Sequence, residues 1–381
     1  MGQNPEKTSG PARWRLGRLT RYLCSPLASR RISLPGQNHS LSYRTPTHRA
    51  AAVSQVRNAL LASRKAVLTT HVNADGDGAG SQAAMVAWLR ANGSEAWIIN
   101  PTKFPDSFRF LIEHQDWVVP AGSSRARDLC DSADLAVVLD TGEVPRIGRV
   151  GQMIRHLPTV IIDHHPIGDH SIGGTALRDV SACATGELVH DVIHEGKGPW
   201  TRQMDEGIYV AILTDTGGFR FENASAGCHR VVSEVIGRGV DPEAMYERIY
   251  GSARIHRYRM LRYALESLDH DPAHGIAWMI VPRDRLEEVQ ATAADLEGFV
   301  DIPRSIEGVE VGLLFRLTAE GDVKISFRSN GRVDVNALAR RFNGGGHVKA
   351  SGAMVPGPMD EAVPKVLDRV RAAVLETRKE T

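Results

Sequence analysis

Four short apolar runs in this chain each end in carboxylate or imidazole side chains. The polar groups that follow them are, in order, His71 with Asp75 and Asp77, then Asp140, then Asp163 with His164 and His165, and finally Asp215. Three of the four runs have the length and composition of buried strands. Since the carboxyl ends of parallel strands meet at one edge of a sheet, the pattern predicts a metal-binding cluster at that edge.

Alternating apolar runs and helical patterns in the first half predict an α/β fold with a doubly wound parallel sheet. The expected strands cover residues 67–70, 96–100, 135–139 and 160–162. The expected helices cover residues 81–91, 108–113, 181–195, 204–214 and 226–237. Asp215 is the exception among the polar groups, because it ends a stretch with a helical pattern rather than a strand.

The second half predicts a smaller α/β domain after a charged helical connector. We expect strands over 276–281, 309–317 and 323–328, and helices over 335–342 and 359–379. The expected division is a basic, disordered extension (1–50), a catalytic domain (51–240), the connector (241–268) and a substrate-binding domain (269–378).

The extension carries nine Lys and Arg residues against one acid, Glu6. An organelle presequence and a basic arm for nucleic acid remain alternatives to disorder there. The whole chain has 381 residues and a net charge of only +1. Its overall charge therefore does not attract it to nucleic acid or to a membrane surface. Four scattered cysteines and no long apolar run favour a cytoplasmic protein with reduced thiols.

The polar groups of the first half suit divalent cations. Aspartate oxygens mixed with imidazole nitrogens fit Mn²⁺, Fe²⁺ or Co²⁺ better than Ca²⁺, and the lack of thiolates disfavours structural zinc. Several acids at one locus would repel each other, and two cations about 3.5–4 Å apart would remove that repulsion. We expect Gly76, Gly78 and Gly80 to allow a tight backbone and close ligand approach there.

Each motif alone has an ordinary explanation. Aspartates after a strand often cap helices or finish turns, and buried histidines are usually hydrogen-bonded core residues. Only their joint occurrence in one domain argues for a metal site.

The glycine-rich stretch Gly344–Gly346, followed by His347, is a second signal. Its free main-chain N–H groups could form an anion-binding nest, although a flexible turn is the simpler interpretation. Ser326 and Arg328 share one face of a strand and could clamp a phosphate together with Arg316. Solvated strand positions are the alternative for these three residues.

Taken together, the motifs resemble those of the DHH phosphoesterases that carry a DHHA1 C-terminal domain. The motifs are His71 to Ser81, Asp140-Thr141-Gly142, Asp163-His164-His165, Asp215-Thr216-Gly217, and Gly344 to His347 with Ala350-Ser351-Gly352. The resemblance covers about residues 52–375. The length of the chain and its pair of domains resemble most the bifunctional oligoribonuclease/PAP phosphatase branch of the family. Ala74 departs from the family's usual proline, which is not a ligand.

The resemblance implies specific roles for these residues. One metal would be held by His71, Asp75 and Asp140, and the other by Asp77, Asp140, His164 and Asp215. Asp163 would orient a ligand histidine, and His165 would contact the scissile phosphate. The nucleotide would be held by Ser326, Arg328, Gly345, Gly346 and His347, with the active site in the cleft between the domains.

We therefore expect a two-metal Mn²⁺ phosphoesterase, with Co²⁺ or Mg²⁺ as substitutes. Its expected substrates are short single-stranded RNA or DNA, linear dinucleotides such as pApA, and the 3′-phosphate of pAp. The alternatives are a RecJ-like exonuclease, a pyrophosphatase or polyphosphatase, and a non-catalytic nucleotide-binding protein. No membrane partner is expected, and homodimerisation is an expectation from the family alone.

Overall fold

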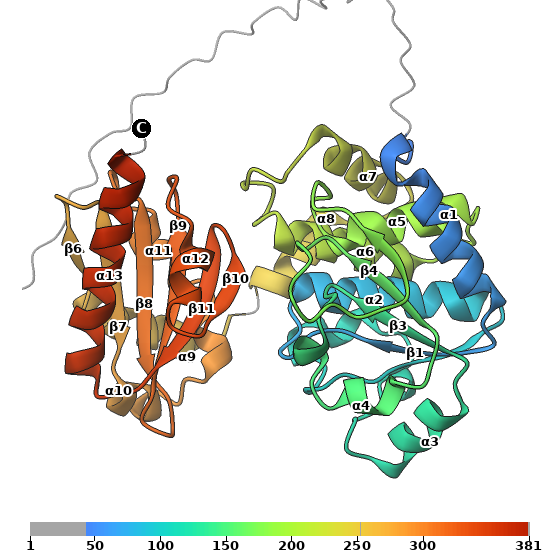
Figure 1. The fold of residues 1–381 in the computed structure, drawn as a ribbon, viewed down its shortest axis with the longest axis horizontal. Coiled ribbons are helices and arrows are strands. Elements are labelled where there is room, and N and C mark those ends of the chain that lie inside the picture. The colour runs from blue at the N-terminus through green and yellow to red at the C-terminus, as the bar shows by residue number, and fades with distance from the viewer. Residues whose placement is uncertain (1–42, 252, 380–381) are drawn as a thin grey trace, which may run out of the picture. The chain divides into compact units, whose positions relative to one another are not determined.

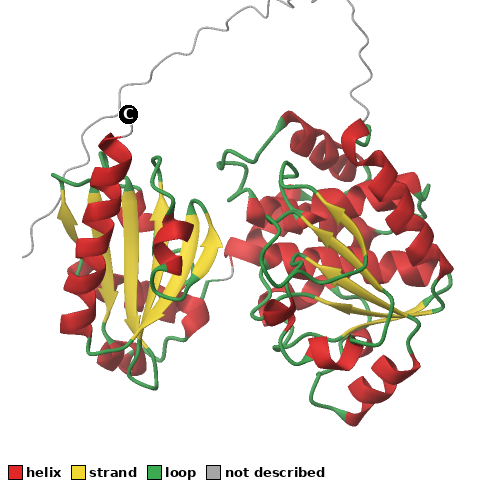
Figure 2. Cartoon of the chain, in the orientation of Figure 1, coloured by secondary structure: helices red, strands yellow, loops and turns green. Residues whose placement is uncertain are grey.

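The computed structural model describes residues 43–251 and 253–379, which form two α/β domains, each built on one sheet (Figures 1 and 2). The first domain contains α1 (Thr47–Ala62), β1 (Lys65–Thr69), α2 (Gly76–Ala91), β2 (Glu95–Ile98), α3 (Ser124–Ser132), β3 (Leu135–Leu139), α4 (Val150–Ile154), β4 (Thr159–Asp163), β5 (Thr175–Arg178), α5 (Thr185–Glu195), α6 (Arg202–Asp215) and α7 (Ala226–Gly237). Short 3₁₀ helices cover Asp106–Leu111, Gln115–Trp117 and Val144–Ile147.

The first sheet has the strand order β2-β1-β3-β4-β5, and all its strands are parallel. Leu68 and Val137 pack on one face in a core shared with α2, α5 and α6. Val67 and Val138 pack on the other face with α3 and α4. Successive strand residues point to opposite faces, so strands covered on both sides read as unbroken apolar runs. The predicted doubly wound sheet is confirmed.

Several details of the first domain differ from the sequence-based expectation. Helices α1, α3 and α4 were not expected, and α2 begins at Gly76 rather than at residue 81. Strand β5 was not expected. The helix predicted over 181–195 begins only at Thr185, after a loop that follows β5. The helix predicted over 108–113 is the 3₁₀ helix Asp106–Leu111. The start of α5 matters most, because the N–H groups of its first residues face the polar cluster described below.

Helices α2 and α6 cross at two glycines. A Cβ atom on Gly80 would lie 2.3 Å from the Gly207 carbonyl oxygen, and one on Gly207 would lie 2.6 Å from the Gly80 oxygen. Nearer the end of α6, a Cβ on Gly76 would lie 2.4 Å from the Thr214 side chain. We expected Gly76, Gly78 and Gly80 to allow a tight backbone and close ligand approach. Gly76 and Gly80 allow close helix packing instead, whereas Gly78 lies beside Asp140, since a Cβ on Gly78 would lie 3.4 Å from Asp140 Oδ2. The crossing brings the end of α6 beside the start of α2.

The second domain follows the helical stretch expected over 241–268. That stretch comprises α8 (Pro242–Tyr246), a π-helical turn (Glu247–Gly251) and α9 (Ile255–Glu266). The remaining elements are β6 (Asp269–Asp271), β7 (Ile276–Val281), α10 (Arg283–Glu288), a 3₁₀ helix (Ala293–Leu296), α11 (Asp301–Arg304), β8 (Val311–Leu317), β9 (Val323–Ser329), α12 (Val335–Arg340), β10 (Gly345–His347), β11 (Ala350–Val355) and α13 (Met359–Lys379).

The second sheet is mixed, with the order β10-β11-β9-β8-β7-β6. Only β7 and β8 pair in parallel among its described strands. Phe315 and Phe327 pack on the face that α12 and α13 cover, whereas Met279 and Leu314 pack with α9 on the other face. The expected smaller α/β domain is confirmed. Within the described part of the chain, no helix has the length and apolar composition needed to cross a bilayer.

The expectation for residues 1–50 is tested only in part, because residues 1–42 lie outside the described residues. Residues 43–50 differ from it: Tyr43 and Arg49 are buried, and α1 begins at Thr47. The Arg-rich composition gave no sign that Arg49 is buried, since a buried arginine and a solvated one look alike in a sequence. The first domain thus includes residues assigned to the extension.

Arg49 is a buried cation with three carboxylate partners. Its guanidinium lies 2.8 Å from Asp179, 2.6 Å from Glu187 and 2.7 Å from Asp191. The Tyr43 hydroxyl donates to Asp191 at 2.8 Å. Buried charges are tolerated only when paired, so Arg49 compensates a group of acids that could not otherwise be enclosed.

Replacing Arg49 with methionine should destabilise the protein by about 3–5 kcal/mol, because the change leaves buried carboxylates without a counter-charge. Urea unfolding at pH 7 measures the effect. Arg57→Met on the same helix is the matched control, since the Arg57–Glu195 pair is long (3.4 Å) and partly exposed; it should cost less than about 1 kcal/mol. Equal losses in the two variants would contradict the role given to Arg49.

Candidate metal centre

The first group of possible metal ligands follows β1 and β3. His71 Nε2 lies 3.2 Å from Asp140 Oδ2 and 3.8 Å from Asp75 Oδ1. Asp75 caps α2 by accepting from the N–H groups of Asp77 and Gly78. Its side chain is 58% exposed, whereas those of His71 and Asp140 are buried. One side of this group is therefore open to a ligand.

The second group joins α2, β4 and α6. His164 Nε2 lies 3.6 Å from Asp77 Oδ2 and 3.6 Å from Asp215 Oδ2. Asp215 reaches the group because the glycine crossing brings the end of α6 to the start of α2. In each group one atom per residue can be chosen so that all lie within 4.8 Å of one another. The structure thus brings together the six residues expected to hold metal.

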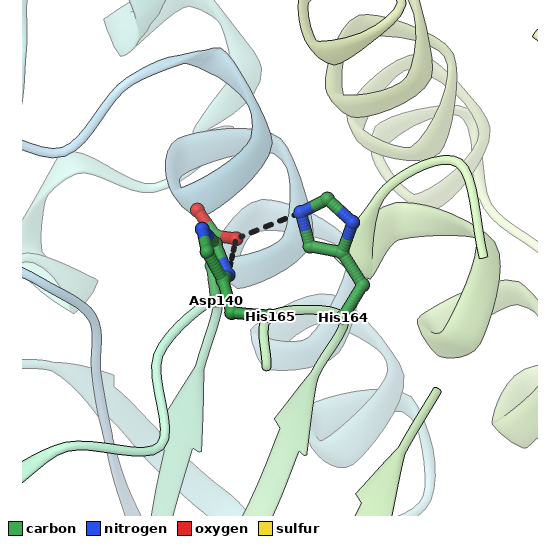
Figure 3. A group of neighbouring side chains, drawn as sticks. All are labelled: Asp140, His164 and His165. Atoms are coloured by element: carbon green, nitrogen blue, oxygen red, sulfur yellow. Dashed lines mark ion pairs between the residues drawn. The ribbon is translucent and has the colours of Figure 1, made fainter. Parts of the chain in front are cut away.

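Asp140 connects the two groups. Its Oδ2 faces His71, whereas its Oδ1 lies 3.8 Å from His164 Nε2 and 3.6 Å from His165 Nδ1. Figure 3 shows ion pairs from this carboxylate, which follows β3, to both of the imidazoles that follow β4. Asp140 has a φ of +60°, a left-handed conformation that costs free energy and recurs at functional sites.

Main-chain carbonyls hold both histidines of the two groups. His71 Nδ1 lies 2.9 Å from the Val72 oxygen, and His164 Nδ1 lies 3.3 Å from the Ala182 oxygen. A carbonyl only accepts, so each Nδ1 carries hydrogen and each Nε2 faces the carboxylates. The buried His164 Nε2 has no hydrogen-bond partner among the described residues. A metal ion would satisfy that atom, and the oxygen and nitrogen donors fit a divalent cation.

The N-terminus of α5 holds Asp77 and Asp140, a contact that the sequence patterns did not indicate. Thr185 and Gly186 donate their N–H groups to Asp77 at 2.7 Å and 2.9 Å, and Ser81 donates its hydroxyl at 3.1 Å. The Thr185 hydroxyl donates to Asp140 Oδ1 at 3.1 Å. A helix N-terminus stabilises nearby negative charge, so α5 partly compensates these acids. A correctly predicted start of α5 would have revealed this contact.

Asn223 is a second missed contributor. Its amide donates to Asp215 Oδ2 at 3.3 Å and to the Cys183 carbonyl at 2.8 Å. This contact orients the Asp215 carboxylate from the loop that follows α6. Nothing in the sequence near Asn223 indicates it, because the contact depends on how that loop folds back.

Burial and mutual repulsion raise the pKa values of Asp77, Asp140 and Asp215, whereas the nearby His71 outweighs burial and lowers the pKa of Asp75. Burial raises the pKa of Asp215 to about 7, and burial and Asp77 hold that of Asp140 well above its usual range. Burial lowers the pKa values of His71 and His164, but the surrounding acids outweigh this effect. The pKa of His71 is raised to about 10 and that of His164 to about 9. Such shifts are typical of functional sites.

Asp163 acts on a different histidine from the one we expected. Its Oδ1 accepts from His165 at both the main-chain N–H (3.1 Å) and Nδ1 (2.8 Å). His164 is instead held by the Ala182 carbonyl. Burial lowers the pKa of His165, although Asp163 opposes that effect. Asp163 thus orients His165, not His164.

Of the residues expected to hold the nucleotide, His347 contacts the cluster. Its ring stacks on that of His165, with ring centroids 4.5 Å apart and planes 28° apart. Burial lowers the pKa of His347 to about 3, with His165 adding to the effect. The imidazole is therefore neutral near pH 7.

The glycines before His347 form a strand rather than a free loop. In β10, Gly345 pairs with Gly352, and Gly346 pairs with Ser351. A Cβ on Gly344 would lie 2.1 Å from the Gly352 oxygen, so glycine is needed there for close backbone contact. The expected anion-binding nest is replaced by the edge strand of the second sheet.

The predicted clamp of Ser326, Arg328 and Arg316 is only partly assembled. Ser326 and Arg328 share the less buried face of β9, as expected. Arg316 lies opposite Lys324, four residues from Arg328 along the strand, which corresponds to about 13 Å. The Arg328 guanidinium lies 3.8 Å from Asp301. The structure therefore does not bring Arg316 beside Arg328.

Comparison with known proteins identifies the class to which this fold and site belong. The model of the DHH family N-terminal domain matches residues 65–213, and that of the DHHA1 domain matches residues 280–376. The chain belongs to the DHH family and carries a DHHA1 domain, and it is a hydrolytic phosphodiesterase or phosphatase.

Among individual proteins, the chain is 33% identical to the bifunctional oligoribonuclease and PAP phosphatase NrnA of Thermus thermophilus, over 80% of this chain and 88% of that protein. It is 28% identical to NrnA of Bacillus subtilis, over 76% and 88%. A crystal structure of an exopolyphosphatase-related protein from Bacteroides fragilis matches with a TM-score of 0.78 and 27% identity, covering 84% of this chain and 96% of that one.

The hydroxyl of Thr185 should matter for metal affinity. Thr185→Val keeps the shape of the side chain and the N–H bond to Asp77 but removes the hydrogen bond to Asp140. We expect a loss of Mn²⁺ affinity of about 10- to 100-fold, measured by isothermal titration calorimetry. Thr185→Ser keeps the hydroxyl and should bind like the parent protein. If valine and serine variants bind Mn²⁺ equally well, the hydroxyl does not orient a ligand.

Proposed function

We propose that this protein is a two-metal, Mn²⁺-dependent phosphoesterase that hydrolyses short oligonucleotides. Linear dinucleotides such as pApA and the 3′-phosphate of pAp are its further substrates. The observation that carries the proposal is the pair of three-residue ligand groups joined at Asp140. The similarity to oligoribonuclease and PAP phosphatase proteins supports the substrate class.

In this proposal His71, Asp75 and Asp140 hold one cation, and Asp77, Asp140, His164 and Asp215 hold the other. Bound Mn²⁺ would supply Lewis-acid activation of water and phosphate. The protein contributes orientation: carbonyls fix the two histidines, and the N-terminus of α5 fixes Asp77. Co²⁺, which accepts oxygen and nitrogen donors alike, and Mg²⁺, which would bind through the carboxylate oxygens, are the expected substitutes.

His165 is the residue that we assign to the phosphate. Asp163 holds its Nδ1, which leaves Nε2 as the nitrogen that can meet a phosphate oxygen. Burial keeps the pKa of His165 below the usual histidine range, whereas the bond to Asp163 favours its protonated form. In that protonated form Nε2 would donate a hydrogen bond to the phosphate oxygen and pass its proton to the leaving oxygen. His165 therefore stabilises the transition state or assists the leaving oxygen.

The DHHA1 domain would hold the rest of the nucleotide. The contact between His347 and His165 supports a substrate position in the cleft between the domains. Gly345 and Gly346 lie on the same short strand as His347 and leave room for a nucleotide, and Ser326 and Arg328 lie two strands away. These residues would contact the substrate. Arg316 would not join them, because it lies opposite Lys324, four residues along the strand from Arg328.

A substrate panel tests the proposed activity. The purified full-length chain with Mn²⁺ should release mononucleotides from RNA of two to five nucleotides and from pApA, and phosphate from pAp. Removing the metal with EDTA should abolish hydrolysis. If no nucleotide is hydrolysed with Mn²⁺, Co²⁺ or Mg²⁺, the proposed function is wrong. Faster hydrolysis of pyrophosphate or polyphosphate than of nucleotides would favour the alternative that the protein is a pyrophosphatase or polyphosphatase.

The two adjacent histidines should respond differently to substitution. His164→Ala removes a metal ligand and should lower bound Mn²⁺, measured by mass spectrometry of dialysed protein. His165→Ala should keep the metal content of the parent but lower kcat by about 10²- to 10⁴-fold, the usual contribution of a general acid or base. Asp163→Asn should also keep the metal content of the parent and lower kcat. Equal metal loss in both histidine variants would refute this division of roles.

A further inference from the structure

A second group of possible metal ligands lies apart from the residues of the candidate metal centre. It consists of His190 and His194 on α5 and Glu234 on α7, and one ligand atom from each lies within 4.8 Å of the others. The two histidines are four residues apart on a helix, so they share one face. Their rings are nearly parallel, with centroids 5.8 Å apart.

His190 is buried without the bonds that a buried imidazole normally makes. Its side chain has no exposed surface, and neither ring nitrogen has a hydrogen-bond partner within residues 43–251 and 253–379. Its Nε2 lies 3.3 Å from Glu234 Oε2, an ion-pair distance without hydrogen-bond geometry. The rings of Tyr43 and Trp200 pack against His190, with centroids 5.0 Å and 5.2 Å from that of its ring. Buried polar groups are nearly always satisfied, so such an atom calls for an explanation.

Glu234 is prepared to bind a cation. Its Oε1 accepts from the main-chain N–H of Tyr43 at 2.8 Å, which fixes the carboxylate with Oε2 toward His190. Interaction with His190 lowers the pKa of Glu234 to about 2, so it is ionised at neutral pH. Burial lowers the pKa of His190, which favours the neutral imidazole that a metal requires.

We propose that His190, His194 and Glu234 form a Zn²⁺ site that ties α5 to α7. Two imidazoles and one carboxylate are a common zinc set, and water would complete the tetrahedron. The candidate metal centre is richer in carboxylates and suits Mn²⁺, so the two sites differ in the metal that they prefer.

The nearest cation does not block this site. Arg238 Nη1 lies 3.7 Å from Glu234 Oε2, but the guanidinium is bound to Asp205 at 2.8 Å and lies over the Trp200 ring. Its charge is therefore partly compensated. Zinc at this position would stabilise α5, whose N-terminus holds Asp77.

The test uses full-length protein carrying Asp140→Asn and His164→Ala, which together remove a ligand from each of the two groups of the candidate metal centre. After dialysis against Zn²⁺, this protein should retain about one equivalent by mass spectrometry. Saturating Zn²⁺ should raise its Tm by about 5 °C or more. Co²⁺ in place of Zn²⁺ should give the visible absorption bands of a tetrahedral ion.

Adding His194→Gln should remove the retained zinc, the shift in Tm and the cobalt bands. His194 is partly exposed, so this change should leave the fold intact, which circular dichroism checks. Glu234→Gln keeps an oxygen for the Tyr43 N–H and should also lose zinc. His229→Gln, at an exposed histidine on α7, is the matched control and should retain it. Equal zinc content with and without His194, or no retained zinc in the protein carrying Asp140→Asn and His164→Ala, would overturn the proposal.

Discussion

The contact between Gly80 and Gly207 sets the distance between α2 and α6, and the assembly of the candidate metal centre depends on that distance. Side chains at either position would meet the opposing carbonyl oxygen at less than 3 Å. Because the helices approach at their backbones, Asp215 at the end of α6 reaches the residues at the start of α2. Sheet topology alone would bring together only the groups that follow β1, β3 and β4.

Compensation of negative charge is the second requirement of this domain. The cluster encloses Asp77 and Asp140 almost completely, and the protein offsets part of their charge with the N-terminus of α5. The start of α5 is in turn fixed by Glu187, which accepts from the Cys183 N–H at 2.9 Å and pairs with Arg49. A buried arginine on α1 thus supports, through two contacts, the orientation of a carboxylate in the candidate metal centre.

The sequence predicted the sheet and the residues of the two ligand groups because both follow from local patterns. Unbroken apolar runs mark strands that are covered on both faces, and residues after such strands converge at one edge. Thr185, Asn223 and Arg49 were missed because their roles depend on distances between elements far apart in the chain. We expected Gly80 to provide a tight backbone for ligand approach, but it allows two helices to pack closely. A glycine looks identical in a sequence whichever of these purposes it serves.

The hydrogen bonds from His71 and His164 to main-chain carbonyls make metal loading an exchange of cations for protons. Without metal, pKa values of about 10 and 9 mean that both Nε2 atoms carry protons at neutral pH. The two Nδ1 protons are held by the carbonyls, so an arriving divalent cation must displace the Nε2 protons. Binding therefore acidifies the solution and weakens as the pH falls. Metal held in this way would be released as the environment becomes acidic.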